Sequence, residues 1–193
     1  SQGKYTITYE LNGGENHPDN PTEYSIEDEF EFQNPTREGY TFGGWYKDPS
    51  FSKGKITKIA KGSTGDLTIY AKWTAKKITV KFDGNGEGAK VSKSSMTVVY
   101  GETYGTNLPT ATREGFEFLG WITEGGVQIT SDSVVIIPEN HTLYARWKSS
   151  IATDAPTADI ISGTEVFAGT KVMLKTSTPG AQIHYTVDGS KPT

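Results

Sequence analysis

Hydrophobic and polar residues alternate along several short stretches of the chain, which is the two-residue period of half-buried β-strands. In the first stretch, residues 4–11, every second side chain is a tyrosine, an isoleucine or a leucine. Further stretches with this alternation lie at residues 24–26, 30–32, 67–73, 78–82, 96–100 and 143–147. No stretch has the spacing of a long amphipathic helix. The pattern predicts a mainly β chain with little helix.

The predicted strands belong to two copies of one sequence unit. Residues 35–45 read PTREGYTFGGW, and residues 109–121 read PTATREGFEFLGW, with two more residues between the proline and the arginine. Residues 69–73 read IYAKW, and residues 143–147 read LYARW. Equivalent positions lie 73–76 residues apart. This repetition predicts two small tandem modules rather than one large domain.

The glycine-rich motif predicts a strand with an irregular centre. Strict alternation places Phe42 and Trp45 on opposite faces, so that large rings would need cover on both sides. Gly44 in mid-strand predicts a β-bulge or a ring lying on the backbone. We interpret Arg37 and Glu38 as an ion pair that fixes the turn before the strand. The four tryptophans, two per module, are expected to be core residues.

The modules are predicted at residues 4–74, called repeat 1, and 77–148, called repeat 2. A linker of about four residues joins them and is too short to let them swing far apart. We therefore expect a semi-rigid tandem pair. A segment rich in Ser, Ala, Thr and Pro at residues 149–156 leads to a third, shorter β module at 157–193.

Composition narrows the classes of function. The formal net charge of −4 gives no basic surface for nucleic acid. Without cysteine the chain has no disulfide framework, thiol nucleophile or Cys-type zinc site. No apolar run approaches the length of a membrane span, so we expect no membrane insertion. The chain starts without Met and stops inside a motif, so we expect it to be a piece of a longer protein.

No group of residues predicts catalysis or a cofactor. His17, His141 and His184 fall one per segment without a partner at metal-ligand spacing, and we interpret them as ordinary surface or strand residues. Residues 83–88 resemble the start of a calcium loop, but Ser94 stands where such a loop has its twelfth-position acid. A hairpin turn is the better interpretation. We expect a protein that is not an enzyme and binds no metal.

Aromatic side chains offer another kind of site, because flat rings can stack on sugars. The aromatic residues retained as ligand-contacting candidates are Tyr46, Tyr104 and Tyr185. Ile122 replaces Tyr46 in the second module, so a sugar platform repeated at that position is not supported. The expected partner is a protein or a glycan outside the cell, without further identification.

The two motifs together resemble the Listeria–Bacteroides repeat, also called the internalin B-repeat. The resemblance rests on Pro-Thr-x-x-Gly-aromatic-x-Phe-x-Gly-Trp followed by Leu/Ile-Tyr-Ala-Lys/Arg-Trp, and it covers about three quarters of the chain. It implies a small β-grasp-like module, arrayed in tandem on bacterial surface and secreted proteins. The family is associated with spacing, adhesion or partner binding, and it offers no catalytic residues to transfer.

Residues 178–193 resemble the chitobiase/β-hexosaminidase C-terminal domain, an immunoglobulin-like β module of bacterial extracellular proteins. The later strands of that family are missing here, and about 40 residues cannot close a sandwich. We therefore expect an open strand edge at residues 183–187. This segment would then be mobile or lean on repeat 2 or a neighbouring chain.

The leading hypothesis is a non-catalytic segment of a bacterial cell-surface or secreted protein, acting as a stalk, adhesion or protein-interaction module. The alternative is a carbohydrate-binding accessory region of a larger extracellular glycan-degrading enzyme. We expect a monomer, with self-association through the open strand edge as a third hypothesis.

Overall fold

The computed structural model describes residues 3–150, 157–158, 173–175, 177–184 and 186. Its contacts divide the chain into two compact units. The first unit contains both repeats except for residues 115–117 and Lys148, which group with the C-terminal segment. Among the described residues there is no helix, so the prediction of a mainly β chain is confirmed. The finer β-grasp assignment stays a prediction.

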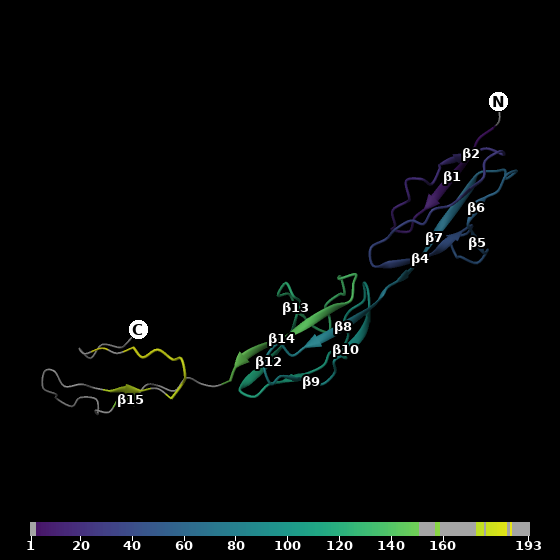
Figure 1. The fold of residues 1–193 in the computed structure, drawn as a ribbon. Helices are drawn as coiled ribbons and strands as arrows, with labels where there is room; N and C mark the ends of the chain where they lie inside the picture. The colour runs from purple at the N-terminus through teal and green to yellow at the C-terminus, as the bar shows by residue number, and fades with distance from the viewer. Residues whose placement is uncertain (1–2, 151–156, 159–172, 176, 185, 187–193) are drawn as a thin grey trace. The chain divides into compact units, whose positions relative to one another are not determined.

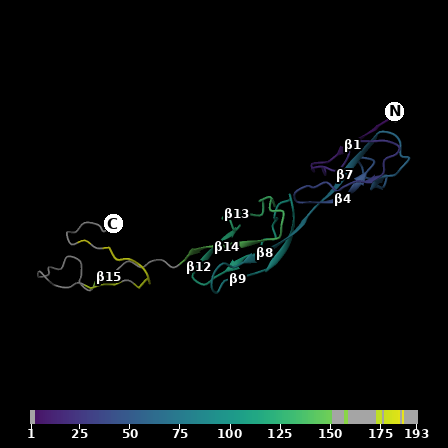
Figure 2. The ribbon, with the colours of Figure 1, turned by 45° about the horizontal axis from the view of Figure 1, so that its top comes forward.

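Repeat 1 folds into a mixed five-stranded sheet (Figure 1). Its strands are β1 (Tyr5–Glu10), β2 (Glu23–Tyr24), β3 (Phe30–Glu31), β4 (Tyr40–Tyr46), β5 (Lys55–Ile56), β6 (Lys58–Ile59) and β7 (Leu67–Ala75). The strand order is β2-β1-β7-β4-β5, and β3 pairs separately with β6. The first and last strands, β1 and β7, run parallel at the centre, side by side in both ribbon views (Figures 1 and 2).

Repeat 2 has the same architecture. Its strands are β8 (Lys77–Asp83), β9 (Lys90–Val91), β10 (Ser95–Val99), β11 (Ala111–Thr112), β12 (Phe116–Ile122), β13 (Gln128–Ile129) and β14 (His141–Ser149). The order β10-β8-β14-β12-β13 matches that of repeat 1, again with a parallel central pair. In the C-terminal segment β15 (Thr157–Ala158) pairs with β16 (Leu174–Lys175). The edge expected at residues 183–187 falls partly outside the described residues.

Sequence alternation becomes one-sided burial in these strands. In β8 the side chains of Ile78, Val80 and Phe82 are 2%, 0% and 6% exposed, while the four residues between and around them are exposed. All three join one apolar cluster with Trp121 and Leu143. A separate cluster forms the core of repeat 1. Each repeat therefore has its own core.

A β-bulge corrects the expectation that the motif's rings face opposite sides. The register between β4 and β7 shifts between Phe42 and Gly44, and Gly44 has a φ of 116° that favours glycine. One extra residue returns Trp45 to the face of Phe42, and their ring centroids lie 5.3 Å apart. In repeat 2 Phe118 and Trp121 lie 5.2 Å apart in the same way. The bulge prediction is confirmed, and the two-faced arrangement is wrong.

The indole hydrogen bonds also correct the alignment of the prolines. Trp45 Nε1 donates to the carbonyl of Gln33, and Trp121 Nε1 donates to the carbonyl of Pro109, each twelve residues earlier. Pro109 therefore takes the place of Gln33, not that of Pro35. Ala111 occupies the buried position of Pro35. The motif of repeat 2 is not longer at this point; its proline stands two residues earlier.

An asparagine turn near the start of each repeat ties the first strand to the last. Asn12 and Asn85 have φ values of 48° and 49°, a left-handed conformation that asparagine tolerates. Their Nδ2 groups donate to the carbonyls of Ala71 and Ala145 at 2.8 and 2.9 Å. This long-range bond explains why asparagine occupies the same place in both copies.

The junction between the repeats is made by backbone and ring contacts. Only Lys76 separates β7 from β8, so the connection is shorter than the predicted linker of about four residues. Its N–H donates to the carbonyl of Gly39, and its carbonyl accepts from the N–H of Tyr100. The ring of Tyr40 packs against that of Tyr100. The turn of the glycine-rich motif thus contacts both the linker and the next repeat.

Candidate functional site

Tyr46, one of the predicted ligand-contacting residues, is only 9% exposed. Its ring packs edge-on against Phe51, with centroids 5.3 Å apart, and Lys72 Nζ lies 5.6 Å from the Tyr46 centroid. The ring is therefore covered by its own loop and by a lysine from β7. It does not form an open stacking surface, and its contact with a ligand stays a prediction.

The loop that carries Phe51 is held by one carboxylate. Asp48 is 7% exposed and accepts hydrogen bonds from the hydroxyls of Ser50 and Ser52 at 2.6 and 2.7 Å. It also accepts from the backbone N–H groups of Ser52 and Lys53. The donated hydroxyls, and then the backbone N–H groups, hold the pKa of Asp48 well below its ordinary value. A carboxylate saturated in this way fixes a loop and does not serve as a general acid.

Tyr104, the second candidate, lines a pocket in repeat 2. It is 3% exposed, and its hydroxyl lies 2.8 Å from Nε2 of His141. Nδ1 of His141 lies 2.9 Å from the carbonyl of Glu139, which can only accept, so Nδ1 carries the proton. The Tyr104 hydroxyl therefore donates to Nε2. Burial raises the pKa of Tyr104. Tyr185, the third candidate, lies outside the described residues.

The pocket has a volume of about 650 Å³. Its described lining comes from Tyr104, from residues 123–125, 127–129, 133, 134, 136, 137 and 139–142, and from Tyr144. Val127, Val134 and Ile136 are 61%, 49% and 71% exposed at its walls. Sequence reasoning missed these three residues. In the apolar run at residues 134–137 the structure has only an isolated bridge at Val134.

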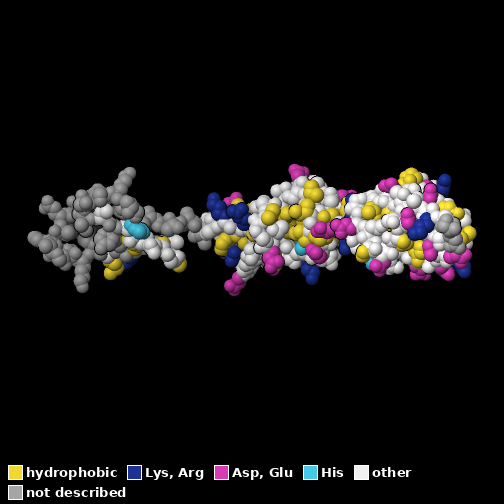
Figure 3. All heavy atoms as spheres, turned by 90° about the horizontal axis from the view of Figure 1, so that it is seen from above, with side chains coloured by type: hydrophobic (Ala, Val, Ile, Leu, Met, Phe, Trp, Pro, Cys, Tyr) yellow, Lys and Arg dark blue, Asp and Glu magenta, His cyan; other side chains and the backbone are white. Residues whose placement is uncertain are grey.

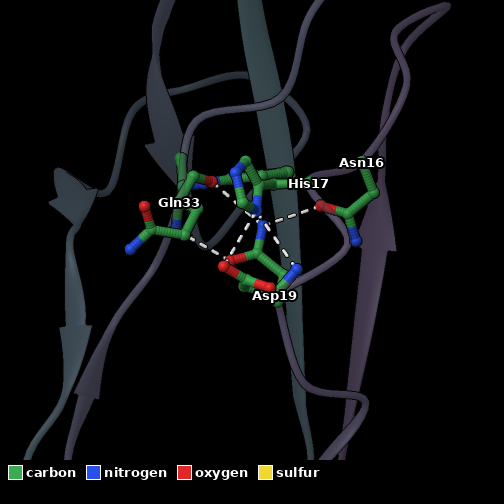
Figure 4. A network of polar contacts seen from close by, with 6 residues as sticks. Asn16, His17, Asp19 and Gln33 are labelled. Carbon is green, nitrogen blue, oxygen red and sulfur yellow. Dashed lines mark hydrogen bonds and ion pairs between the residues drawn. The ribbon is translucent and has the colours of Figure 1, made fainter.

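A polar network links the loop between β1 and β2 to Gln33, which follows β3 (Figure 4). The buried Asn20 donates from Nδ2 to Asn16 Oδ1 and to the carbonyl of Gln33, and its Oδ1 accepts from the Gln33 N–H. That same Gln33 carbonyl accepts from Trp45 Nε1. His17 lies beside the network, with Nδ1 accepting from the N–H of Asp19. These bonds are satisfied within the chain and anchor the loop between β1 and β2.

The motif arginine makes a different contact from the one expected. No ion pair joins Arg37 to Glu38 within the part of the chain that the structure describes, so that interpretation is wrong. The Arg37 guanidinium lies over the Tyr40 ring, 3.6 Å from its centroid, and packs on Gly13. In repeat 2 Arg113 packs on Gly86 in the same way. In each repeat the guanidinium group thus connects the asparagine turn after the first strand to the turn at the start of the glycine-rich motif.

The segment that resembles a calcium loop forms the turn after β8. The N–H of Asn85 donates to Asp83 Oδ1 at 2.7 Å, and Trp147 Nε1 donates to the carbonyl of Gly84. The first contact shapes the turn after β8, and the second ties that turn to β14. No group of three or more His, Asp or Glu side chains is placed to hold a metal ion in the described ranges.

Comparison with known proteins gives two family matches. The Listeria-Bacteroides repeat domain matches residues 5–72 and 79–146, and the chitobiase/beta-hexosaminidase C-terminal domain matches residues 161–193. These matches confirm both resemblances found in the sequence.

Similar proteins include two from Evansella cellulosilytica and one from Listeria monocytogenes. A putative Gly-rich membrane protein of Evansella cellulosilytica is 32% identical over 157 residues, which is 78% of this chain and 17% of the relative. A putative membrane protein of the same organism is 31% identical over 154 residues, or 77% and 23%. Internalin H of Listeria monocytogenes is 31% identical over 130 residues, or 65% and 22%. The chain thus spans about a fifth of the length of these relatives. Among the described residues no helix is long and apolar enough to cross a bilayer.

Proposed function

The chain belongs to the Listeria–Bacteroides repeat family, and on that premise we propose that it is a non-catalytic spacer and interaction segment of a bacterial cell-surface or secreted protein. The names of its relatives point to the cell envelope, since two are described as membrane proteins and one as an internalin. The proposal includes a location at the cell surface or outside the cell and a role in adhesion or interaction.

The proposal rests on what the residues shared by the two repeats do in the structure. Trp45 and Trp121 fill the cores, Asn12 and Asn85 join the first strand to the last, and the motif arginines pack on glycines. Each of these contacts builds the module. A sequence repeated for architecture is what a spacer needs, whereas a repeated active site would place reactive groups at matched positions.

The junction supports the spacer part of the proposal. Lys76 is hydrogen-bonded on both sides, and Tyr40 covers Tyr100 across the boundary. Such contacts restrict the motion of one repeat against the next, because rotation at the linker would break two backbone hydrogen bonds and a ring contact.

Surface exposure can be tested with single cysteines, because the chain has none. Thr106, an exposed residue, is replaced by Cys in the parent protein in its own bacterium, and intact cells are treated with a membrane-impermeant maleimide. We expect labelling of Thr106→Cys without lysis. Val80→Cys, at a position 0% exposed, is the matched control and should react only after denaturation. The unsubstituted parent measures background. Labelling of Thr106→Cys only after lysis would overturn the surface location.

One observation favours a second candidate function. The match of residues 161–193 to the chitobiase/beta-hexosaminidase C-terminal domain suggests a carbohydrate-binding accessory region of a larger extracellular glycan-degrading enzyme. Calorimetric titration of the purified chain with cell-wall and host polysaccharides tests this alternative. Saturable heat would support it, and silence across the panel would count against it.

A further inference from the structure

The pocket of repeat 2 is built from residues that the shared fold does not require. The N–H groups of Phe32 and Tyr104 bond to the carbonyls of Thr57 and Ser133, which makes Phe32 and Tyr104 equivalent. Likewise, Leu67 lies opposite Ile7 in the parallel pair of repeat 1, and His141 lies opposite Val80 in that of repeat 2. A hydrogen-bonded Tyr–His pair thus replaces a Phe and a Leu.

The loop beside the pocket also differs between the two repeats. In repeat 1 residues 47–54 connect β4 to β5, and this loop brings Phe51 onto Tyr46. In repeat 2 residues 123–127 connect β12 to β13, and they include no aromatic residue. The tight turn leaves Val127 exposed at the pocket wall instead of covering the sheet.

The pocket combines an apolar wall with negative charge. Six large hydrophobic side chains are exposed among the described residues, and three of them, Val127, Val134 and Ile136, line this pocket. Among the described residues, the charged residues that line the pocket are Glu124 and Glu139, and no lysine or arginine lines it. Figure 3 shows hydrophobic side chains gathered on the face of repeat 2, in the middle of the view, with acidic side chains nearby. Exposed apolar surface of this kind marks interaction sites.

We propose that this pocket binds an extended peptide segment of a partner protein that carries an aliphatic or aromatic side chain beside a lysine or arginine. The apolar side chain contacts Val127, Val134 and Ile136, and the cation lies near Glu124 and Glu139. Charge complementarity selects the basic residue, since the described lining offers two carboxylates and no cation. Aliphatic walls suit a peptide side chain better than the flat face of a sugar.

The edge of the sheet gives a reason for an extended conformation. β13 is the last strand in the order β10-β8-β14-β12-β13, and its residues Gln128 and Ile129 line the pocket. Its outer side has no strand partner in the described chain. A peptide that pairs with this edge directs alternate side chains toward the pocket, as in β-strand addition.

The experiment uses the purified chain and a phage library of random peptides, with one enriched peptide synthesised for calorimetry. This proposal deepens the interaction role proposed above, but binding in solution does not depend on where the parent protein resides. A negative result here therefore leaves the maleimide experiment intact, and a negative maleimide result leaves the peptide measurement intact.

Two double variants and one control separate the contributions. Val127→Ser/Ile136→Ser removes apolar wall at exposed positions, and Glu124→Gln/Glu139→Gln removes the charge. Leu119→Ser, on β12 and 39% exposed, lies outside the pocket and is the control. Each variant must unfold at the same midpoint temperature as the unsubstituted chain.

We expect enriched peptides to place an apolar residue next to Lys or Arg. The serine pair should weaken binding about tenfold or more. The glutamine pair should weaken it several-fold and remove its dependence on salt, while Leu119→Ser should bind like the parent. Absence of enrichment, selection of acidic peptides, or equal binding by the serine pair would overturn the proposal. So would a glycan that binds the parent chain and loses affinity in the same variants.

Discussion

The ring of Tyr40 in repeat 1 packs edge-on against the ring of Tyr100 in repeat 2, with 5.9 Å between centroids and 80° between planes. Tyr40 follows the motif glycine Gly39, and a Cβ on Gly39 would overlap the Tyr100 ring. The glycine-rich motif therefore has two purposes in repeat 1. It shapes the turn before β4 and accepts an aromatic side chain from the next repeat.

Replacing Gly39 should disturb the contact between the repeats and lower the free energy of unfolding. Gly39→Ala combines a positive φ of 78° with the overlap on Tyr100. Gly54→Ala, at a φ of 74° with no atom within 4 Å of the added Cβ, carries the backbone strain alone. We expect Gly54→Ala to cost about 1 kcal/mol of unfolding free energy and Gly39→Ala to cost about 2 kcal/mol or more. Urea denaturation measures both, and equal costs would contradict the contact.

The turn that carries Tyr100 has an exposed counterpart in repeat 1. The N–H of Asp28 bonds to the carbonyl of Ser25, and that of Glu102 bonds to the carbonyl of Val99, so Ile26 and Tyr100 occupy equivalent positions. Ile26 is 40% exposed. We expect Tyr100→Ser to lower the unfolding free energy by about 2 kcal/mol and Ile26→Ser by about 0.5 kcal/mol or less. Thermal melts of the two variants provide the comparison, and a larger loss from Ile26→Ser would be inconsistent with this assignment.

Trp121 should be among the most costly positions to truncate. It is 2% exposed, packs against Phe82 and Phe118, and donates to the carbonyl of Pro109. We expect Trp121→Ala to destabilise repeat 2 by about 3–5 kcal/mol, because it leaves a cavity and an unpaired carbonyl. Leu119→Ala, on the same strand, should cost about 1 kcal/mol or less. Chemical denaturation checks the difference.

Substitutions at Asn85 can separate backbone strain from the hydrogen bond. Asn85→Ala loses the bond to the Ala145 carbonyl and places alanine at a φ of 49°, for an expected cost of about 2 kcal/mol. Asn85→Gly relieves the strain but not the lost bond, for an expected cost of about 1 kcal/mol. Equal destabilisation by the two variants, measured by urea unfolding, would show that the backbone conformation contributes nothing.

Alkaline stability should depend on Tyr9. Its hydroxyl donates to the carbonyl of Pro21 at 2.6 Å, and burial raises the pKa of Tyr9 from 10.0 to about 12. The folded state therefore favours the neutral phenol, and this contribution is complete below pH 10 and lost as the pH rises toward 12. We expect Tyr9→Phe to show a shallower alkaline loss than the parent chain.

Unfolding free energies measured across that pH range provide the check, with phenolate absorbance reporting ionisation. Burial also raises the pKa of Tyr24 and Tyr104, so Tyr9→Phe should remove only part of the slope. An unchanged slope would show that Tyr9 does not titrate late.

Several features of the fold were predictable because they depend on local periodicity. The alternation in residues 78–82 places Ile78, Val80 and Phe82 inside whatever the strand pairs with, since side chains of a strand point alternately to its two faces. The bulge at Gly44 was predictable from a glycine in mid-strand. Its consequence for Trp45 was not, because one extra residue reverses the face of everything that follows.

The candidate site was less accessible to sequence reasoning. Tyr104 was among the candidates, yet its partner His141 lies 37 residues away and was interpreted as an ordinary residue. Val127 and Ile136 belong to irregular segments, where periodicity carries no information on exposure. Only the folded structure shows that these segments line one pocket together with residues of β13.

By itself, the amino-acid sequence determined that this protein consists of two copies of a small β module, followed by a third segment, with aromatic cores and no evident reactive group. These properties reside in residue type and spacing, which are local. The tertiary structure alone decided which carbonyl each indole meets, how Gly39 accepts Tyr100, and where repeat 2 opens a pocket beside β13. Such contacts join residues far apart in the chain, and they exist only once the strands have paired and the loops have closed.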